Sequence, residues 1–284
     1  GFVDDDLNLY SEDEITDRKN TIVIIFNHGQ QDGQKKVERC NKGASDVPEF
    51  VRNLHNKKVN DLTIKIYRMC SGVRGLNDPQ MDRVHNMIVQ DENTNGLLEV
   101  IDYDGMRLFD KVKQNLRRQI VLDKIDELIE NNFSNIVLMG HSCGAFLSIY
   151  LTAHFPEKIK ASIVTNPACY GENIKPRNVI GDKNTYSIWK ALRDDWEKKI
   201  SQFSEINALS FIHDEDSHEN SETLSFLEKI NKFKIINYTD FGCKKMFGTD
   251  FHTAPVYPAK DNCFTQWEAK NNYIINYLEE VFEN

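Results

Sequence analysis

The chain has 284 residues, of which 40% are hydrophobic and 28% are charged, an ordinary balance for a globular protein with a sizeable core. Its net charge of −9 argues against nucleic acid as a main partner, because phosphate binding needs a basic face. No apolar run approaches the roughly 20 residues that a membrane-spanning helix needs, so we also expect no transmembrane segment.

The chain begins with Gly1, which we expect from processing of a longer chain or from an added tag, so a signal peptide could already be gone. The six cysteines contain no Cys-x-x-Cys pair, which argues against a zinc or thioredoxin-type site. Free thiols in the cytoplasm and disulfides in an exported protein both stay open, with Cys40–Cys70 as the pairing to test. The sequence leaves the oligomeric state open as well.

In chain order, the acidic and polar residues 1–19 predict an extended or loosely ordered lead-in. Residues 21–26 form a continuous run of β-branched and apolar side chains, which predicts a buried parallel strand. An Asp followed by Pro and Glu then predicts the start of a helix over residues 46–57. Residues 62–69 predict the next strand.

Residues 80–104 have no clear pattern, and we expect an insertion or loop with one irregular helix. Apolar residues at helical spacing predict a long helix over residues 106–131. The elements expected beyond it are a strand at 134–139, a helix from Ala145, a strand at 160–167, an amphipathic helix within 170–200, a strand at 206–213, a helix at 222–231, a strand at 233–238 and a closing helix at 264–282. This alternation predicts an α/β fold: one domain over residues 1–284, with a mostly parallel sheet of about six strands and helices on both faces.

One motif stands out: Gly140-His141-Ser142-Cys143-Gly144 follows a strand pattern and precedes a helix pattern. A bare Gly-x-Ser-x-Gly is weak evidence, but strand, motif and helix together are the context of a nucleophile elbow. The serine of an elbow sits on a tight turn, where only glycine leaves room two positions to either side. The helix that follows offers amide donors and a positive dipole end to an oxyanion.

With these flanks the chain resembles the α/β-hydrolases, the serine-nucleophile superfamily of esterases and lipases, from about residue 20 to its end. The resemblance implies a serine, an acid and a histidine in that chain order, each after a strand. It makes Ser142 the nucleophile and His252, in a loop before the closing helix, the base. Asp216 fits the spacing of the acid best, and Asp214 and Glu215 stay close rivals.

The resemblance also implies that His28-Gly29 marks the oxyanion-hole loop, so that the backbone amides of Gln30 and Cys143 would hold the oxyanion. It implies a cap or lid within residues 170–200, and the alternative is an ordinary surface helix whose aromatic residues pack into the core. In larger members two strands precede the first one visible here, so we expect the sheet to be short at that edge. We expect the Cys143 side chain to be a small buried thiol.

We therefore expect a serine hydrolase, carboxylesterase- or lipase-like, that cleaves a small-molecule ester or related acyl substrate through an acyl-enzyme, with no cofactor and no metal. Thioesterase, peptidase and acyltransferase activities use the same residues, so the substrate stays open. From a different class, a non-catalytic binding protein on this fold is the alternative. A divalent-cation site is a further alternative, although its spacing matches neither the calcium loop nor the zinc helix motif. Its ligands would be His213, Asp214, Asp216, His218 and Glu219.

Overall fold

The computed structural model describes all residues except 5, 7, 30–46, 70–104, 170–182, 241–250, 258–261 and 284. The strands are β1 (Phe2–Val3), β2 (Leu9–Tyr10), β3 (Thr21–Asn27), β4 (Lys58–Val59), β5 (Leu62–Arg68), β6 (Asn135–His141), β7 (Ala161–Thr165), β8 (Glu205–Ile212) and β9 (Asn231–Asn237). The α-helices are α2 (Glu49–Arg52), α5 (Gly105–Glu130), α6 (Cys143–His154), α7 (Lys183–Ser201), α8 (Cys263–Asn271) and α9 (Tyr273–Phe282). Three short 3-10 helices are η1 (Glu12–Glu14), η3 (Ser225–Lys229) and η4 (Phe251–Val256).

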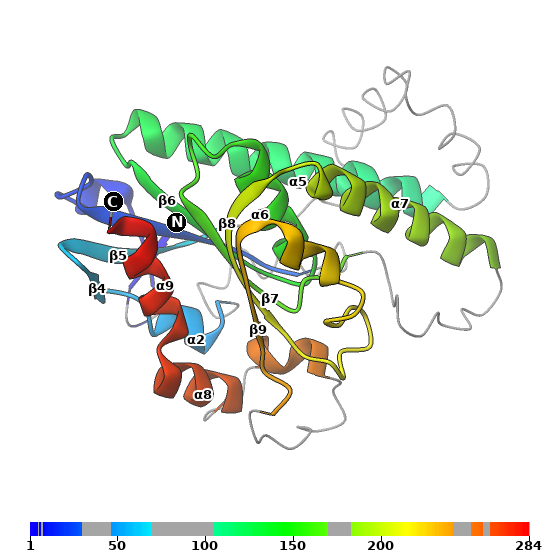
Figure 1. Cartoon of the computed structure of the whole chain (residues 1–284). Coiled ribbons are helices and arrows are strands. Elements are labelled where there is room, and N and C mark those ends of the chain that lie inside the picture. Colours follow the sequence, from blue (N-terminus) through cyan, green and yellow to red (C-terminus); the bar gives the residue numbers. More distant parts are fainter. Residues whose placement is uncertain are drawn as a thin grey trace.

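The described strands form one sheet in the order β2-β1-β5-β3-β6-β7-β8-β9, with β4 paired to β5 (Figure 1). The strands from β5 to β9 along this order are parallel to one another. The strands β1, β2 and β4 join antiparallel at one side. The predicted α/β class with a mostly parallel sheet is confirmed, and the sheet is larger than expected because these three short strands were not foreseen.

The N-terminal segment is extended, as one of the two predicted alternatives has it, and its strands β1 and β2 enlarge the sheet at the edge that was expected to be short. Phe2 pairs with Tyr67 of β5, and on its other side with Tyr10 of β2. The Phe2 ring is fully buried, with its centroid 5.1 Å from that of Tyr67 and 5.7 Å from that of Phe133. Two-residue strands are too short to carry a readable alternation of apolar and polar residues. The sheet is therefore not short at this edge.

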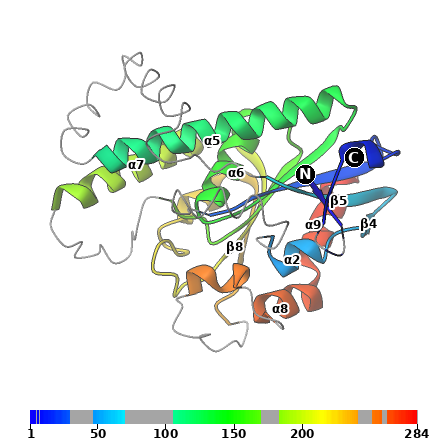
Figure 2. The same cartoon turned by 180° about the vertical axis from the view of Figure 1, so that it is seen from behind.

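Helices cover both faces of the sheet, which explains the continuous apolar run of β3. Ile22 and Ile24 of β3 belong to the core cluster that includes side chains of α2, α8 and α9. Val23 and Ile25 point the other way, into the cluster with α5 and α6. Helix α7 packs on the same side as α6. Figures 1 and 2 show α5 and α7 above the sheet and α8 below it, and the two chain ends lie at the same end of the molecule.

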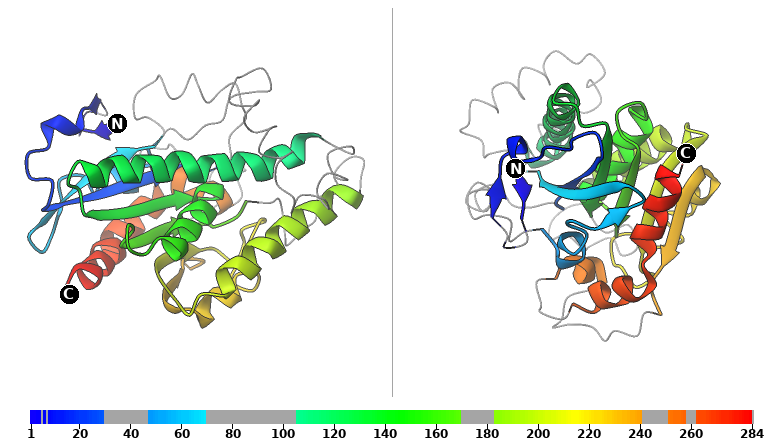
Figure 3. Two further views of the ribbon diagram at one scale, coloured as in Figure 1. Left: turned by 90° about the horizontal axis from the view of Figure 1, so that it is seen from above. Right: turned by 90° about the vertical axis from the view of Figure 1, so that its left-hand side faces the viewer.

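The position of β3 fixes where loops can form a site. Strand β3 lies between β5 and β6, so the chain leaves β3 toward one side of the sheet and later returns to its other side. The carboxyl ends of β3 and β6 are neighbours, with Asn27 opposite Gly140. In open parallel sheets, ligand crevices form at such a switch point, outside the carboxyl ends of the strands. Figure 3 shows β6 running beneath α5, seen from above.

Three predicted helices differ from the structure. The closing helix is two helices, because Asn272 takes a left-handed conformation with φ 54° between α8 and α9. The helix expected over residues 222–231 is only the 3-10 turn η3, since β9 begins at Asn231 and leaves no room for a longer helix. The helix expected from Asp46 is the single turn α2, capped by Pro48, and Asp46 itself lies outside the described residues.

No helix among the described residues combines the length and apolarity that crossing a membrane requires. The irregular segment expected at 80–104 lies outside the described residues.

Candidate active site

The Gly-x-Ser-x-Gly motif forms a sharp turn between β6 and α6. Ser142 has φ 55° and ψ −122°, a backbone region that residues with a Cβ rarely adopt. A Cβ on Gly144 would lie 2.0 Å from the carbonyl oxygen of Asn27, and one on Gly140 would lie 2.3 Å from that of Gly144. Glycine is therefore required at both positions, and the crowded backbone holds the serine in its strained turn.

Ser142, His252 and Asp216 form one continuous hydrogen-bonded chain. Ser142 Oγ lies 2.9 Å from Nε2 of His252, and Nδ1 of the same ring lies 2.8 Å from Oδ2 of Asp216. His252 comes from η4, and Asp216 from the turn that follows β8. Both side chains are buried. With its proton on Nδ1, the imidazole turns the lone pair of Nε2 toward the serine hydroxyl, the arrangement that proton transfer from serine requires.

The two rival acids lie elsewhere. Asp214 is exposed, and its carboxylate accepts hydrogen bonds from the Asn237 side chain at 2.8 Å and the Ser221 amide at 3.4 Å. Glu215 is exposed as well. The backbone amide of Asp216 donates to the His213 carbonyl at 3.0 Å, and this turn carries its carboxylate inward. Of the three acids, Asp216 is the one in contact with His252.

The Asp216 carboxylate is held in its charged form. Burial raises its pKa, but hydrogen bonds from His218 and His252 act in the opposite direction and bring the pKa down to about 2. The backbone amide of His218 donates to Oδ1 of Asp216 at 2.8 Å, while His252 takes Oδ2. A permanent negative charge therefore lies beside the ring that would become an imidazolium ion.

Two further histidines enclose His252. The His218 ring stacks on one side, with centroids 4.0 Å apart and planes at 22°, and the His141 ring lies 5.1 Å away at 45°. Burial lowers the pKa of His141 to about 3, with a smaller contribution from His252 in the same direction. His141 is thus neutral at physiological pH, whereas Asp216 is charged. Nothing in the sequence marked His141 or His218 as neighbours of the base.

The predicted oxyanion donors are only partly described. Gln30 lies outside the described residues, and Cys143 is the first residue of α6, where amide groups point out of the helix end. Gly29 does approach the serine, because a Cβ at this position would lie 3.1 Å from the Cβ of Ser142. The loop after β3 therefore passes directly beside the elbow.

A buried arginine that the sequence did not reveal holds the start of that loop. The guanidinium of Arg117, on α5, donates to the carbonyl oxygen of His28 at 2.6 Å and to Gln114 at 3.4 Å. Arg117 is fully buried, and burial lowers its pKa to about 10, so it remains charged at neutral pH. A helical arginine in an otherwise amphipathic pattern looks like a surface residue, which is why no sequence signal identified it.

No family model and no curated protein matches the chain. Among solved structures, the chain is similar to Est1E from Butyrivibrio proteoclasticus at 14% identity and a TM-score of 0.47, over 94% of this chain and 90% of that one. It is similar to a Paleococcus ferrophilus monoacylglycerol lipase at 11% identity and a TM-score of 0.46, over 90% and 94% of the two chains. A predicted CIB-like hydrolase from Thermoplasma acidophilum aligns at 12% identity and a TM-score of 0.44, over 99% and 97%.

Because these identities and TM-scores are low, the fold assignment rests on the chain's own architecture. A serine turn follows β6 beside the switch point of the sheet, and an acid and a histidine follow later strands in that order. The chain has the α/β-hydrolase fold.

Cys143 does not carry the free thiol that we expected. It is bonded to Cys169 by a disulfide that spans 26 residues of sequence and joins the serine turn to the segment after β7. Cys263 is disulfide-bonded as well, so no cysteine in the described part of the chain is free. Cys40 and Cys70 lie outside the described residues. The absence of Cys-x-x-Cys spacing could not reveal a bridge between residues that only the fold brings together.

Helix α7 is anchored to the acid turn by a buried ion pair. Arg193 donates to Glu219 Oε1 at 2.7 Å, and both side chains are almost completely buried. Trp196 of the same helix stacks on Phe146 of α6, with ring centroids 3.7 Å apart. Trp196 therefore packs in the core, while the side chains of residues 183–189 and all of residues 170–182 lie outside the described part. A cap over the serine stays a prediction.

The five residues proposed from the sequence as a cation site do not all come together, since only Asp216 and His218 of them lie in one group of possible ligands. His213 stacks on Phe251, and Glu219 binds Arg193. Among the described residues, one group offers ligand atoms within 4.8 Å of one another, and it is Asp216, His218 and His252. Within this group, both ring nitrogens of His252 are already hydrogen-bonded, Nδ1 to Asp216 and Nε2 to Ser142. These donors fit a proton relay better than a metal.

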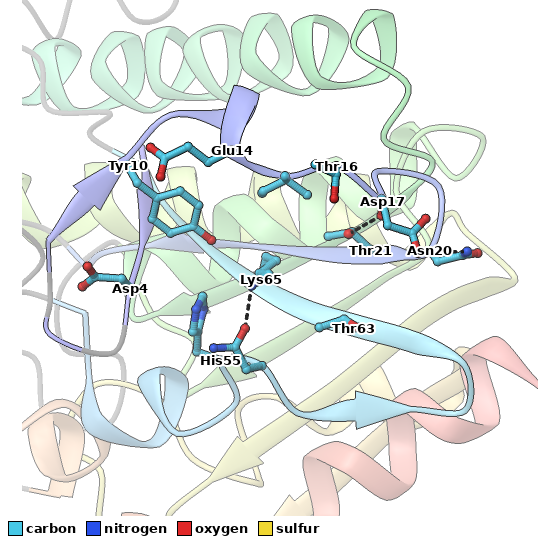
Figure 4. A pocket seen from close by; sticks show the side chains of 12 residues that line it. Asp4, Tyr10, Glu14, Thr16, Asp17, Asn20, Thr21, His55, Thr63 and Lys65 are labelled. Carbon is cyan, nitrogen blue, oxygen red and sulfur yellow. Dashed lines mark hydrogen bonds between the residues drawn. The ribbon is translucent and has the colours of Figure 1, made fainter.

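A cavity of about 440 Å³ lies between the N-terminal segment and the first halves of β3 and β5 (Figure 4). Its lining includes Tyr10, Thr21, His55 and Lys65, and Lys65 donates to Asn56 at 2.5 Å. Thr21 begins β3, whereas the serine turn lies beside the opposite end of that strand. This cavity is therefore separate from the candidate active site.

Proposed function

We propose that this α/β-hydrolase is a serine hydrolase that cleaves a carboxylic ester or related acyl compound through an acyl-enzyme. Ser142 is the nucleophile, His252 the general base and acid, and Asp216 the carboxylate that orients and balances His252. The amides of Gln30 and Cys143 are the oxyanion donors. The observation that carries the proposal is the unbroken contact chain of 2.9 Å and 2.8 Å from serine through imidazole to carboxylate.

The chemistry follows from the acid–base properties of these three groups. A serine hydroxyl is a poor nucleophile at neutral pH, so its proton must leave for His252 Nε2 as Oγ attacks the carbonyl carbon. The imidazolium that forms is stabilised by the Asp216 carboxylate. The oxyanion of the tetrahedral intermediate accepts hydrogen bonds from the two amides, and its collapse expels the alcohol, which takes the proton from His252.

Water then repeats the sequence on the acyl-enzyme. His252 takes a proton from the water as it attacks the acyl carbon, and the proton returns to Ser142 Oγ when the acid leaves. The same residues would pass the acyl group to another acceptor if one bound in place of water. Loss of one oxyanion donor costs about 10²–10³ in rate at such sites, so the loop after β3 matters as much as the relay.

The experiment that tests the proposal is labelling with a fluorophosphonate, a probe that phosphonylates activated serines. We expect the wild type to be labelled on the peptide that contains Ser142, and Ser142→Ala and His252→Ala to remain unlabelled. Ser201→Ala is the matched control, because Ser201 is an exposed serine at the end of α7, and it should label like the wild type.

Labelled enzyme would next be screened on p-nitrophenyl esters of increasing chain length, to find the acyl group that gives the highest kcat/KM. An unlabelled wild type that is folded by circular dichroism would contradict the proposal. It would favour the non-catalytic binding protein on the same fold.

A further inference from the structure

A short segment after β7, residues 166–169, touches both the nucleophile and the base. Asn166 and Ala168 are buried. Asn166 has φ 43°, a left-handed conformation that is uncommon for a residue other than glycine. Asparagine adopts this conformation more readily than most residues, so the contacts of the segment, and not backbone strain, indicate what it does.

The Asn166 carboxamide is hydrogen-bonded to the backbone at His252. Its Nδ2 donates to the carbonyl oxygens of Phe251 at 2.7 Å and His252 at 2.9 Å. Its Oδ1 accepts a hydrogen bond from the Tyr238 hydroxyl at 2.8 Å. Both amide protons and the carbonyl oxygen are thus used at once. A buried carboxamide that is satisfied in this way fixes its partners closely, because any displacement leaves a buried polar group without a partner.

On the side of the nucleophile, the same segment meets the elbow in three places. The Ala168 amide donates to the Ser142 carbonyl at 3.4 Å, and the Ala168 carbonyl lies 3.2 Å from Ser142 Oγ. The third contact is covalent, the disulfide between Cys169 and Cys143. The serine hydroxyl has one proton, so the Ala168 carbonyl and His252 Nε2 compete for it. The position of this segment therefore bears on the relay itself.

We propose that residues 166–169 act as a bracket that sets the distance between Ser142 and His252, and that the Cys143–Cys169 disulfide makes the catalytic rate of this site sensitive to reduction. Asn166 and the disulfide are thus positioning elements, which act through His252 and through the Cys143 amide. The inference rests on the proposed function, since it concerns the rate of that reaction.

Reduction by a dithiol is the chemical step. A thiolate of the dithiol attacks one sulfur of the bridge and forms a mixed disulfide with the protein. The second thiol of the reagent then attacks this mixed disulfide and releases the remaining cysteine as a thiol. Two electrons and two protons pass to the protein, which is left with the thiols of Cys143 and Cys169 and with the reagent as a cyclic disulfide. Without the disulfide, the backbone amide of Cys143 and the bracket of residues 166–169 can move apart. A displacement of about 1 Å in a catalytic group can cost on the order of 10² in rate.

The first test compares kcat and KM for a p-nitrophenyl ester before and after treatment with dithiothreitol. We expect kcat to fall at least about tenfold and KM to change less than about twofold, with recovery after reoxidation. Cys169→Ala should have the low kcat from the start and should not respond to the reductant. Cys263→Ala should keep the response, because its bridge is a different one.

Two outcomes would overturn the role of the disulfide. One is a reduced wild type, with both thiols proved by alkylation and mass spectrometry, that keeps its full kcat. The other is a Cys169→Ala variant that loses activity on reduction as the wild type does, because the sensitivity would then come from another bridge.

The second test removes the Asn166 side chain without straining its backbone. Asn166→Gly suits a positive φ, so we expect it to fold while losing the hydrogen bonds to η4. Its rate of fluorophosphonate labelling should fall about 10- to 100-fold at unchanged ester KM. Asn207→Ala is the control, because its side chain donates to the Lys160 carbonyl at 3.2 Å on an exposed part of the sheet, and its labelling rate should equal that of the wild type.

The two proposals fail in different ways in this experiment. An unlabelled, folded wild type contradicts the proposed function. A labelled wild type whose rate equals that of Asn166→Gly contradicts the bracket alone.

Discussion

At the elbow, Ser142 is held by backbone crowding: a Cβ on Gly144 would come within 2.0 Å of a neighbouring carbonyl oxygen, and a disulfide adds a covalent link. Across the site, His252 and Asp216 are held by hydrogen bonds and ring stacking. The elbow thus depends on shape and the acid–base pair on polar contacts. Substitutions should therefore damage the fold on the first side and the chemistry on the second.

Gly144→Ala breaks the crowded side and should have the largest effect. The added methyl meets backbone at a distance that no rotamer change can relieve, so we expect insoluble protein or a loss of more than about 5 kcal/mol in the free energy of unfolding. Urea unfolding followed by circular dichroism measures the loss. Ala153→Gly on the same helix is the matched control and should cost about 1 kcal/mol. A Gly144→Ala protein as stable as the wild type would contradict the steric explanation.

Asp216→Asn breaks the polar side and should leave the fold intact. Asparagine has the shape of aspartate but cannot balance the imidazolium or hold its tautomer, so kcat should fall about 10³- to 10⁴-fold. The free energy of unfolding at pH 7 should fall by about 2 kcal/mol, because the lowered pKa of Asp216 means that its charged form stabilises the fold at this pH, and circular dichroism should still show a native spectrum.

The rival acids supply the controls for this substitution. Asp214→Asn and Glu215→Gln should keep kcat within about twofold, because both side chains are exposed and do not contact His252. If either of them lost as much activity as Asp216→Asn, the acid would be assigned wrongly.

The same contrast explains what could be predicted from the sequence. The elbow is local: strand, glycines and helix are contiguous, so strand, turn and helix were predicted where β6 and α6 lie. The long helix α5 was likewise predicted from apolar residues at helical spacing, and the buried strand β3 from a continuous apolar run. The sequence predicted a mostly parallel sheet but not the order of its strands, because pairing partners are set by packing across the whole chain.

Contacts between distant residues were beyond the sequence. Ser142 and His252 lie 110 positions apart, and His252 and Asp216 lie 36 apart, so three neighbouring acids could not be told apart by spacing. The disulfide of Cys143 and the buried Arg117 were missed for the same reason, since each is defined by a partner far along the chain. Short elements such as β1 escaped because two residues carry no period.

Glu219→Gln tests how firmly the acid turn is tied to α7. Arg193 would remain charged and buried but would lose the buried carboxylate of Glu219. The free energy of unfolding should therefore fall by about 3–5 kcal/mol. Glu197→Gln, which removes the half-exposed second partner of Arg193, should cost less than about 1 kcal/mol. Equal losses in the free energy of unfolding for the two variants, measured by urea unfolding, would show that burial of the ion pair does not increase its contribution to stability.

His141→Gln gives the smallest expected effect and tests the pH dependence of the cluster around the base. The pKa of His141 is lowered from 6.5 to about 3, so the folded protein keeps this ring neutral while the unfolded chain takes up a proton below pH 6.5. Because only the unfolded chain gains from binding this proton, the free energy of unfolding is unaffected above about pH 6.5 and decreases as the pH falls toward 3. Between pH 7 and pH 5 the wild type should lose about 2 kcal/mol from this group.

His141→Gln cannot take up that proton, so its free energy of unfolding should fall about 2 kcal/mol less than that of the wild type between pH 7 and pH 5. Asp216 does not blur this comparison, because its lowered pKa removes stability only as the pH falls from 3.8 toward about 2. Urea titrations at the two pH values measure the difference. Equal losses in the two proteins would mean that the His141 ring is protonated, or exposed to water, in the folded state. A positively charged His141 ring would then lie 5.1 Å from that of His252, where its charge would oppose the imidazolium ion that the proposed reaction forms.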